Sequence, residues 1–215
     1  MTDAQSIAAR LPAPRDLERR CMSLAMLDAV LSPDWQSRYY SFNRRWSPET
    51  GTRMASMRNG SGDEFFILFF PDGSAALKGF AHESRALAGQ SSIAGVFEGL
   101  PARFAEFANE PAFSPATTTF CLWNEGGAWQ RSRAIGAAQL AVDGSAELLA
   151  LLVGAPADYV AFVRDYFERE VANAVVARFY AHETLTAELA SALDADASLA
   201  PIADDIDQIG YPAAV

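Results

Sequence analysis

The chain has 215 residues, half of them hydrophobic and 20% charged, which is typical of one globular domain or of a domain with a small appendage. Its formal net charge is −10, from 27 acidic and 17 basic residues, and this disfavours general attraction to a nucleic-acid backbone. The longest apolar runs, residues 65–70 and 148–153, are too short to span a bilayer, so no membrane partner is expected.

The first ten residues contain an early acid and no apolar core, which argues against a secretory signal. The two cysteines, Cys21 and Cys121, lie in apolar surroundings without metal-ligand spacing. Buried, reduced thiols are the ordinary state of such residues in the cytoplasm. We therefore expect a cytoplasmic protein.

In chain order, a loose N-terminal arm ends at Pro12 and Pro14, and residues 15–32 then place apolar side chains at helical spacing. Ser32-Pro33 should stop this amphipathic helix. Four strand-like runs follow, separated by turns that contain Pro or Gly; they cover residues 37–43, 52–58, 63–70 and 75–80. Since the run from Phe65 to Phe70 is apolar on both alternate faces, both sides of the sheet should be covered there.

Further along, a helix is predicted over residues 92–110, split by Pro101, and a late hairpin over residues 117–133. From Gly144 the pattern becomes helical, with a stop at Gly154 and a new helix opened by Pro156. Another helix is expected in the segment 184–194, which begins with a threonine suited to an N-cap. Beyond it, four apolar residues could still pack on the core: Ile202, Ile206, Ile209 and Tyr211.

Together these elements predict an α+β fold, an antiparallel meander sheet with flanking helices and a helical C-terminal part. The N-terminal helix and the β-rich region would occupy residues 1–143. The helical region would occupy residues 144–215 and pack on the same core as one domain.

Charge is distributed unevenly along the chain. Five arginines but only one acid lie between Arg38 and Arg58, whereas the stretch from Glu183 onward has seven acids and no Lys or Arg. The favoured interpretation is a solvated acidic tail and an Arg-rich sheet face; the alternative is that the two segments meet, within one chain or between two. Arg38, Tyr40 and Trp46 are the interface candidates, because Arg, Tyr and Trp dominate interface energetics. Nucleic-acid binding by this basic, aromatic segment is a minor option.

Several catalytic motifs are absent from the sequence. "NGSGDE" lacks the lysine of a phosphate-binding loop and leads into a strand, and its "GSG" is not a nucleophile elbow. His82 and His182 are each followed by Glu, but the helical zinc motif H-E-x-x-H is missing. We predict neither a metal nor a cofactor, although a site that joins the two His-Glu pairs is geometrically open.

One candidate site remains, where polar residues gather at the ends of the apolar hairpins. It includes Lys78, the only lysine of the chain. If the strands pair in meander order, a salt-bridge network or a small binding site could form from Arg58, Asp63, Glu64, Lys78, His82 and Glu83. The network is the favoured interpretation.

Four segments, "RYYSFN", "MASMRNGSGDEFFILF", "KGFAHES" and "TTTFCLWNEGG", resemble motifs of a family of bacterial proteins of unassigned function. The similarity extends into the C-terminal part and covers most of the chain. It implies a bacterial, cytoplasmic origin and transfers no functional residue.

Two functional hypotheses follow. The first is a non-enzymatic module that binds an unknown protein, for example an immunity-like or antitoxin-like protein whose acids neutralise a basic partner. The second is a small hydrolase-like or ligand-binding enzyme that uses the charged cluster. Association into a homodimer is compatible with either hypothesis.

Overall fold

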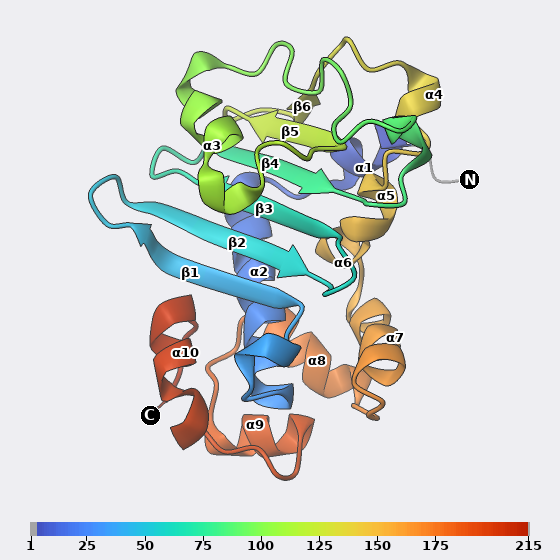
Figure 1. Cartoon of the computed structure of the whole chain (residues 1–215). Helices are drawn as coiled ribbons and strands as arrows, with labels where there is room; N and C mark the ends of the chain where they lie inside the picture. The colour runs from blue at the N-terminus through green and yellow to red at the C-terminus, as the bar shows by residue number, and fades with distance from the viewer. Residues whose placement is uncertain (1–3, 215) are drawn as a thin grey trace.

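A six-stranded antiparallel sheet forms the centre of the computed structural model, which describes residues 4–214. Its strands follow one another in chain order (Figure 1). They are β1 (Tyr40–Ser47), β2 (Thr52–Arg58), β3 (Glu64–Phe69), β4 (Ala75–Phe80), β5 (Phe120–Asn124) and β6 (Gln130–Arg131). The predicted α+β meander is therefore confirmed, including the late hairpin that forms β5 and β6.

Helices precede the sheet, cross over it between β4 and β5, and make up most of the chain after β6. The α-helices are α1 (Ala4–Arg10), α2 (Pro14–Leu31), α3 (Ala105–Asn109), α4 (Ala137–Leu140), α5 (Ser145–Leu148), α6 (Ala150–Val153), α7 (Pro156–Tyr166), α8 (Asn173–Tyr180), α9 (Ala187–Leu193) and α10 (Ala203–Ile209). Short 3₁₀ helices are η1 (Trp35–Ser37), η2 (Arg85–Leu87), η3 (Ala102–Phe104), η4 (Pro111–Phe113) and η5 (Ala200–Ile202). None of the helices within residues 4–214 combines the length and apolar character needed to cross a bilayer.

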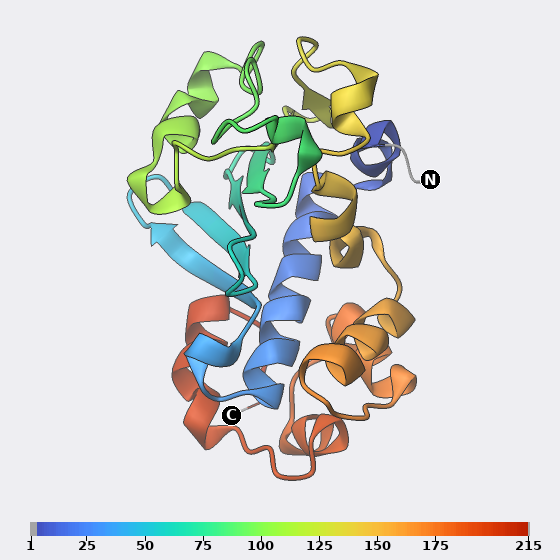
Figure 2. The ribbon, with the colours of Figure 1, turned by 45° about the vertical axis from the view of Figure 1, so that its right-hand side comes forward.

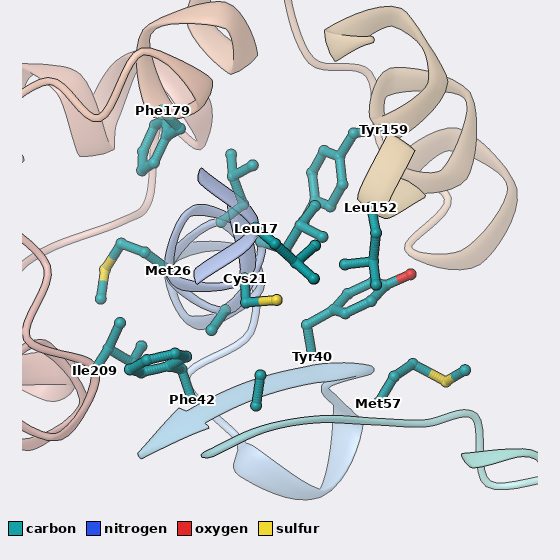
Figure 3. Packing of buried hydrophobic residues seen from close by; sticks show 14 of the residues in the cluster. Leu17, Cys21, Met26, Tyr40, Phe42, Met57, Leu152, Tyr159, Phe179 and Ile209 are labelled. Atoms are coloured by element: carbon teal, nitrogen blue, oxygen red, sulfur yellow. The ribbon is translucent and has the colours of Figure 1, made fainter. Parts of the chain in front are cut away.

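Helix α2 lies between the sheet and helices α6, α7 and α8, whereas α10 packs against β1 (Figure 2). Helix α2 opens with Pro14 in its first turn and ends at Ser32, whose backbone is extended, before Pro33. The predicted apolar stripe understates its burial, because every residue from Ser23 to Leu31 is buried. Figure 3 shows why: Phe42 of β1 packs on one side of α2, while Tyr159 of α7 and Phe179 of α8 surround the other.

The opposite face of the sheet has its own core. Phe66 of β3, Cys121 and Trp123 of β5 pack there against residues of the long crossover between β4 and β5, such as Phe104 and Phe113. As a result, both faces of β3 are covered, as its continuous apolar run predicts.

Three local predictions differ from the structure. Residues 92–110 form turns and only short helices, because Gly95 and Gly99 adopt φ values of 77° and 82°, which a right-handed helix does not allow. The N-terminal arm is helix α1, which is held because Ile7 and, just after the helix, Leu11 are buried in the main core. The N-cap of α9 is Thr186, two residues after the first threonine of its segment.

The C-terminal helices share the main core with the N-terminal half. Buried residues from Ile7 to Tyr211 belong to one cluster, which includes all four apolar residues predicted to pack near the C-terminus. The acidic and arginine-rich segments also meet, within this chain. Arg38 forms a bidentate ion pair with Asp205, at 2.7 and 2.9 Å, while Arg44 and Arg45 both bind Asp207.

Candidate functional site

The six charged residues of the predicted cluster separate into three groups. Asp63, His82 and Glu83 lie together at one end of the sheet. Arg58 and Glu64 are cross-strand neighbours on β2 and β3 and form a separate ion pair at 3.5 Å. Lys78 lies apart from both groups, in the covered middle of β4.

The Asp63–His82 pair is built by the turn between β2 and β3. The side-chain oxygen of Asn59 accepts hydrogen bonds from the backbone N–H groups of Ser61 and Asp63, which closes the turn. Its amide nitrogen donates to Asp63 Oδ2 at 2.7 Å. Asp63 Oδ1 accepts a hydrogen bond from the backbone N–H of His82, at 2.9 Å. The same oxygen pairs with Nδ1 of the His82 ring at 2.7 Å. Gly62, with a φ of 110°, turns the chain beside the His82 ring.

Electrostatics favour the ionised forms of both partners. Burial by itself would raise the pKa of the Asp63 carboxyl, but hydrogen bonds from the His82 ring, the His82 backbone and Asn59 outweigh it and lower that pKa. The hydrogen bond to Asp63 raises the pKa of His82, and the Asp63 and Glu83 charges add to this effect. Around neutral pH, Asp63 and His82 are therefore both charged more readily than an isolated aspartate and histidine would be.

A surface pocket of about 440 Å³, here called the dyad pocket, opens beside this pair. One wall comes from the hairpin ends and the other from the segment of α4 and α5. The lining residues are Asp63, Ala81, His82, Glu83, Ser84, Arg85, Leu140, Ala141, Val142, Asp143, Gly144, Ala146, Glu147 and Leu148. Pairing through Nδ1 leaves His82 Nε2 without a hydrogen bond to residues 4–214, and Glu83 Oε1 lies 3.7 Å from it. Such a nitrogen can exchange a proton with a bound molecule.

Lys78 has an unusual environment for a lysine. Its side chain is 1% exposed and lies between Phe66 and Cys121 on the neighbouring strands. Among residues 4–214, its Nζ has no hydrogen-bond partner. Burial lowers its pKa, although the nearby Cys121, Glu64 and Glu110 favour the charged form. Lys78 does not line the pocket beside Asp63 and His82, so it belongs to the core and not to a site with these two residues.

The three interface candidates are placed differently from one another. Tyr40 is buried in the main core, and the Arg38 side chain is 4% exposed in its ion pair with Asp205. Trp46 is half-buried and stacks on Phe113, with ring centroids 5.1 Å apart. Trp46 therefore offers part of its surface to a partner, and Arg38 contributes to the groove described next.

The structure reveals a second site that the sequence analysis missed, here called the aromatic groove. It is a groove of about 320 Å³ lined by Trp35, Gln36, Arg38, Tyr39, Ser41, Ser56, Arg58 and Gly60. Trp35 is 59% exposed and Tyr166 of α7 is 40% exposed, and they are the large hydrophobic side chains that stand out into solvent within residues 7–214. Tyr166 borders the groove, since its ring lies 4.3 Å from that of Tyr39 and its hydroxyl donates to the Ser37 carbonyl.

Strand alternation contained the signal for this groove. Because Tyr40 and Phe42 face the main core, Ser41 faces away from it, whereas Tyr39, just before β1, is half-buried and packs against the edge of that core. Ser41 pairs with Ser56 across β1 and β2, and their hydroxyls hydrogen-bond at 2.7 Å. The sequence does not reveal which of the two alternating faces of the strand is covered, so it could not single out Ser41 and Ser56 as groove residues.

The two histidines do not come together. His182 follows α8 with a φ of 61°, packs on Tyr211 with ring centroids 4.5 Å apart, and lies 3.4 Å from the Ser23 hydroxyl through Nδ1. Glu183 pairs with Arg178. Within residues 4–214, no group of three or more His, Cys, Asp or Glu side chains is arranged to hold a metal ion.

Comparison with known proteins adds no relative: no family model, no curated protein and no solved structure gives a significant match to this chain. The dyad pocket, the aromatic groove and the charges around them are therefore the features of the molecule that point to a function.

Proposed function

We propose that the chain is a non-enzymatic binding module that holds a partner protein in the aromatic groove. The observation that carries this proposal is the exposure of Trp35 and Tyr166 beside Tyr39 and Arg58 on one surface. Trp, Tyr and Arg are the residue types that most often dominate binding energy at protein interfaces. Two exposed aromatic rings next to each other also leave apolar area that a partner would remove from water.

The charge of the chain suggests the nature of that partner. A net charge of −10 attracts a basic protein over long range, which suits an immunity-like or antitoxin-like role. The C-terminal acids cannot all serve this purpose, because Asp205 and Asp207 are engaged by arginines of the same chain. Cytoplasmic location is part of the proposal, and the unpaired, buried cysteines Cys21 and Cys121 fit a reducing compartment.

Trp35→Ala should weaken binding of the partner at least about tenfold, because it removes the most exposed aromatic side chain of the groove. Native mass spectrometry of the tagged chain from its own cells would identify a partner at fixed stoichiometry, and titration calorimetry would then measure its affinity. Gln208→Ala, on the exposed side of α10, is the control and should leave the affinity unchanged. A partner that binds wild type and Trp35→Ala equally well would contradict the proposal.

The Asp63–His82 pair supports a second candidate function, a hydrolase-like enzyme. A carboxylate that holds Nδ1 selects the tautomer with a free Nε2, and this nitrogen could activate a water molecule in the dyad pocket. The carboxylate itself is held by Asn59, as a positioned catalytic pair requires. We rank this function second because no nucleophile or oxyanion-stabilising group lies in hydrogen-bond contact with His82 Nε2 among residues 4–214.

If the chain is such an enzyme, His82→Gln should lower hydrolysis of chromogenic esters or phosphodiesters by about 10²-fold or more, with little change in melting temperature. His182→Asn is a matched control, since Asn tolerates the left-handed backbone of that position. Equal rates for wild type and His82→Gln, or no hydrolysis by the wild type, would leave Asp63 and His82 as a structural ion pair.

A further inference from the structure

A third pocket, here called the hairpin pocket, opens where the β1–β2 turn, the β3–β4 turn and α3 meet. Its volume is about 430 Å³. The residues that line it are Trp46, Ser47, Thr50, Thr52, Leu68, Phe70, Pro71, Asp72, Arg103, Glu106, Phe107 and Glu110. Neither of the proposed functions uses this pocket.

Aromatic rings form much of its wall. Trp46 and Phe70 are half-buried and present part of their rings to the pocket, whereas Phe107 is buried behind them. The π-face of such a ring carries partial negative charge and attracts cations. The chain itself shows this preference, because the Arg103 guanidinium lies 5.9 Å from the Phe70 ring centroid and 5.3 Å from that of Phe104.

The charges of the lining also favour a cation. Arg103 is neutralised by its ion pair with Asp72. Glu106 is exposed, Glu110 is half-buried, and within residues 4–214 neither forms an ion pair. Glu110 Oε1 accepts the backbone N–H of Ala112 at 3.1 Å, which holds the carboxylate in place. The lining thus carries an excess of two negative charges next to aromatic rings.

We propose that the hairpin pocket binds the side chain of an arginine or lysine presented by a basic protein partner. The aliphatic stem of such a side chain would lie against Trp46 and Phe70, and its charged head would pair with Glu106 and Glu110. An anionic ligand would face two uncompensated carboxylates, and a neutral apolar ligand would leave them without a partner.

The position of the pocket favours a protein over a small free cation. The hairpin pocket and the aromatic groove lie along the same two strands, since Ser56 of β2 lines the groove and Thr52 lines the pocket. Four residues of a strand span about 13 Å. A partner protein whose extended segment fills the groove can therefore place a basic side chain of the same segment, a few residues further along, in the pocket. The hairpin pocket shares no lining residue with the aromatic groove, so its binding of a basic side chain can be tested independently of the proposed function.

The test uses N-acetyl-arginine amide as the probe and the indole N–H signal of Trp46, assigned with Trp46→Phe, as the readout in ¹H–¹⁵N spectra. We expect a saturable shift with a dissociation constant in the millimolar range, and at least about tenfold weaker binding of the neutral isostere N-acetyl-citrulline amide. The double variant Glu106→Gln/Glu110→Gln should weaken binding of the arginine probe at least about tenfold. Glu98→Gln/Glu125→Gln, which removes the same charge from exposed positions outside the pocket, should not.

Three results would overturn the inference: no shift of the Trp46 signal at up to about 50 mM probe, equal binding of the citrulline probe, or full binding by the Glu106→Gln/Glu110→Gln variant. Failure of the proposed function is distinguishable from failure of this inference. Trp35→Ala should leave binding of the arginine probe intact, whereas the two Glu variants leave the aromatic groove unaltered.

Discussion

Asp28→Ala should lower the free energy of unfolding by about 3 kcal/mol or more, a large part of the total for a domain of this size. Asp28 is fully buried near the end of α2. Its Oδ2 accepts the backbone N–H groups of Tyr39 and Tyr40, both at 2.9 Å, and its Oδ1 accepts the Tyr159 hydroxyl at 2.6 Å. One side chain therefore joins α2, the entry to β1 and α7, and alanine would leave three polar groups without partners.

Urea denaturation of wild type and variant would measure this loss. Tyr159→Phe is the matched control, because it removes only the hydroxyl that donates to Asp28 and should cost about 1 kcal/mol. If Asp28→Ala cost no more than Tyr159→Phe, the two backbone hydrogen bonds would contribute nothing and the assigned role of Asp28 would be incorrect.

The same residue should produce a pH dependence of known sign. Burial raises the pKa of the Asp28 carboxyl from 3.8 to about 6, against the lowering effect of its hydrogen bonds from Tyr159, Tyr40 and Tyr39. The folded state therefore binds a proton more tightly than the unfolded state. The contribution of Asp28 to stability is therefore largest below pH 3.8, the pKa of the carboxyl in the unfolded chain. It falls by about 3 kcal/mol as the pH rises through the pKa of the folded state.

Asp28→Asn removes this titration and can still accept the two backbone hydrogen bonds through its side-chain oxygen. The difference in unfolding free energy between wild type and Asp28→Asn, measured at about pH 4 and about pH 7, should move in favour of the variant at the higher pH. The other titrating groups contribute equally to both proteins and cancel in this difference. If the difference between wild type and Asp28→Asn did not change with pH, the raised pKa of Asp28 would be contradicted.

Lys78→Met should raise the free energy of unfolding by about 2 kcal/mol. Within residues 4–214 the buried Nζ of Lys78 has no hydrogen-bond partner, and the Phe97 ring, whose centroid lies 5.9 Å from Nζ, replaces only part of the interaction with water that the amine loses. Methionine keeps an unbranched apolar chain next to Phe66 and Cys121 and removes the polar atom. Lys78→Gln, which retains an unpaired polar group, is the control and should not stabilise the chain.

The pH dependence of this effect follows from the lowered pKa of Lys78. Since the unfolded state keeps the ordinary pKa of 10.5, it binds more protons than the folded state between the two values. Stability of the wild type should therefore rise with pH in this alkaline window, and Lys78→Met should lack the rise. A destabilised Lys78→Met variant would instead show that Lys78 forms a useful ion pair with Glu64 or Glu110 in solution.

Much of the fold follows from local sequence. The turns at residues 59–62 and 71–74 contain glycines that adopt positive φ, and they connect apolar runs short enough to be strands; meander order is the direct result. The helix α2 and its end at Ser32-Pro33 are likewise set by spacing and by proline. Of the helix predicted at residues 92–110 and split by Pro101, the part after Pro101 is helical over residues 102–109. The part before Pro101 was wrong because helical spacing of apolar residues was given more weight than Gly95 and Gly99.

The candidate sites depended on contacts between residues far apart in the chain. The sequence by itself determined that Asp63 and His82 stand at neighbouring hairpin ends, since strand pairing in meander order brings them together. Only the tertiary structure decided that the crossover after β4 covers Lys78, that Tyr40 is buried while the half-buried Tyr39 lines the groove, and that α10 neutralises Arg38. The physical reason is that a strand has two equivalent faces, and the helices and loops that pack on each face are supplied by distant parts of the chain.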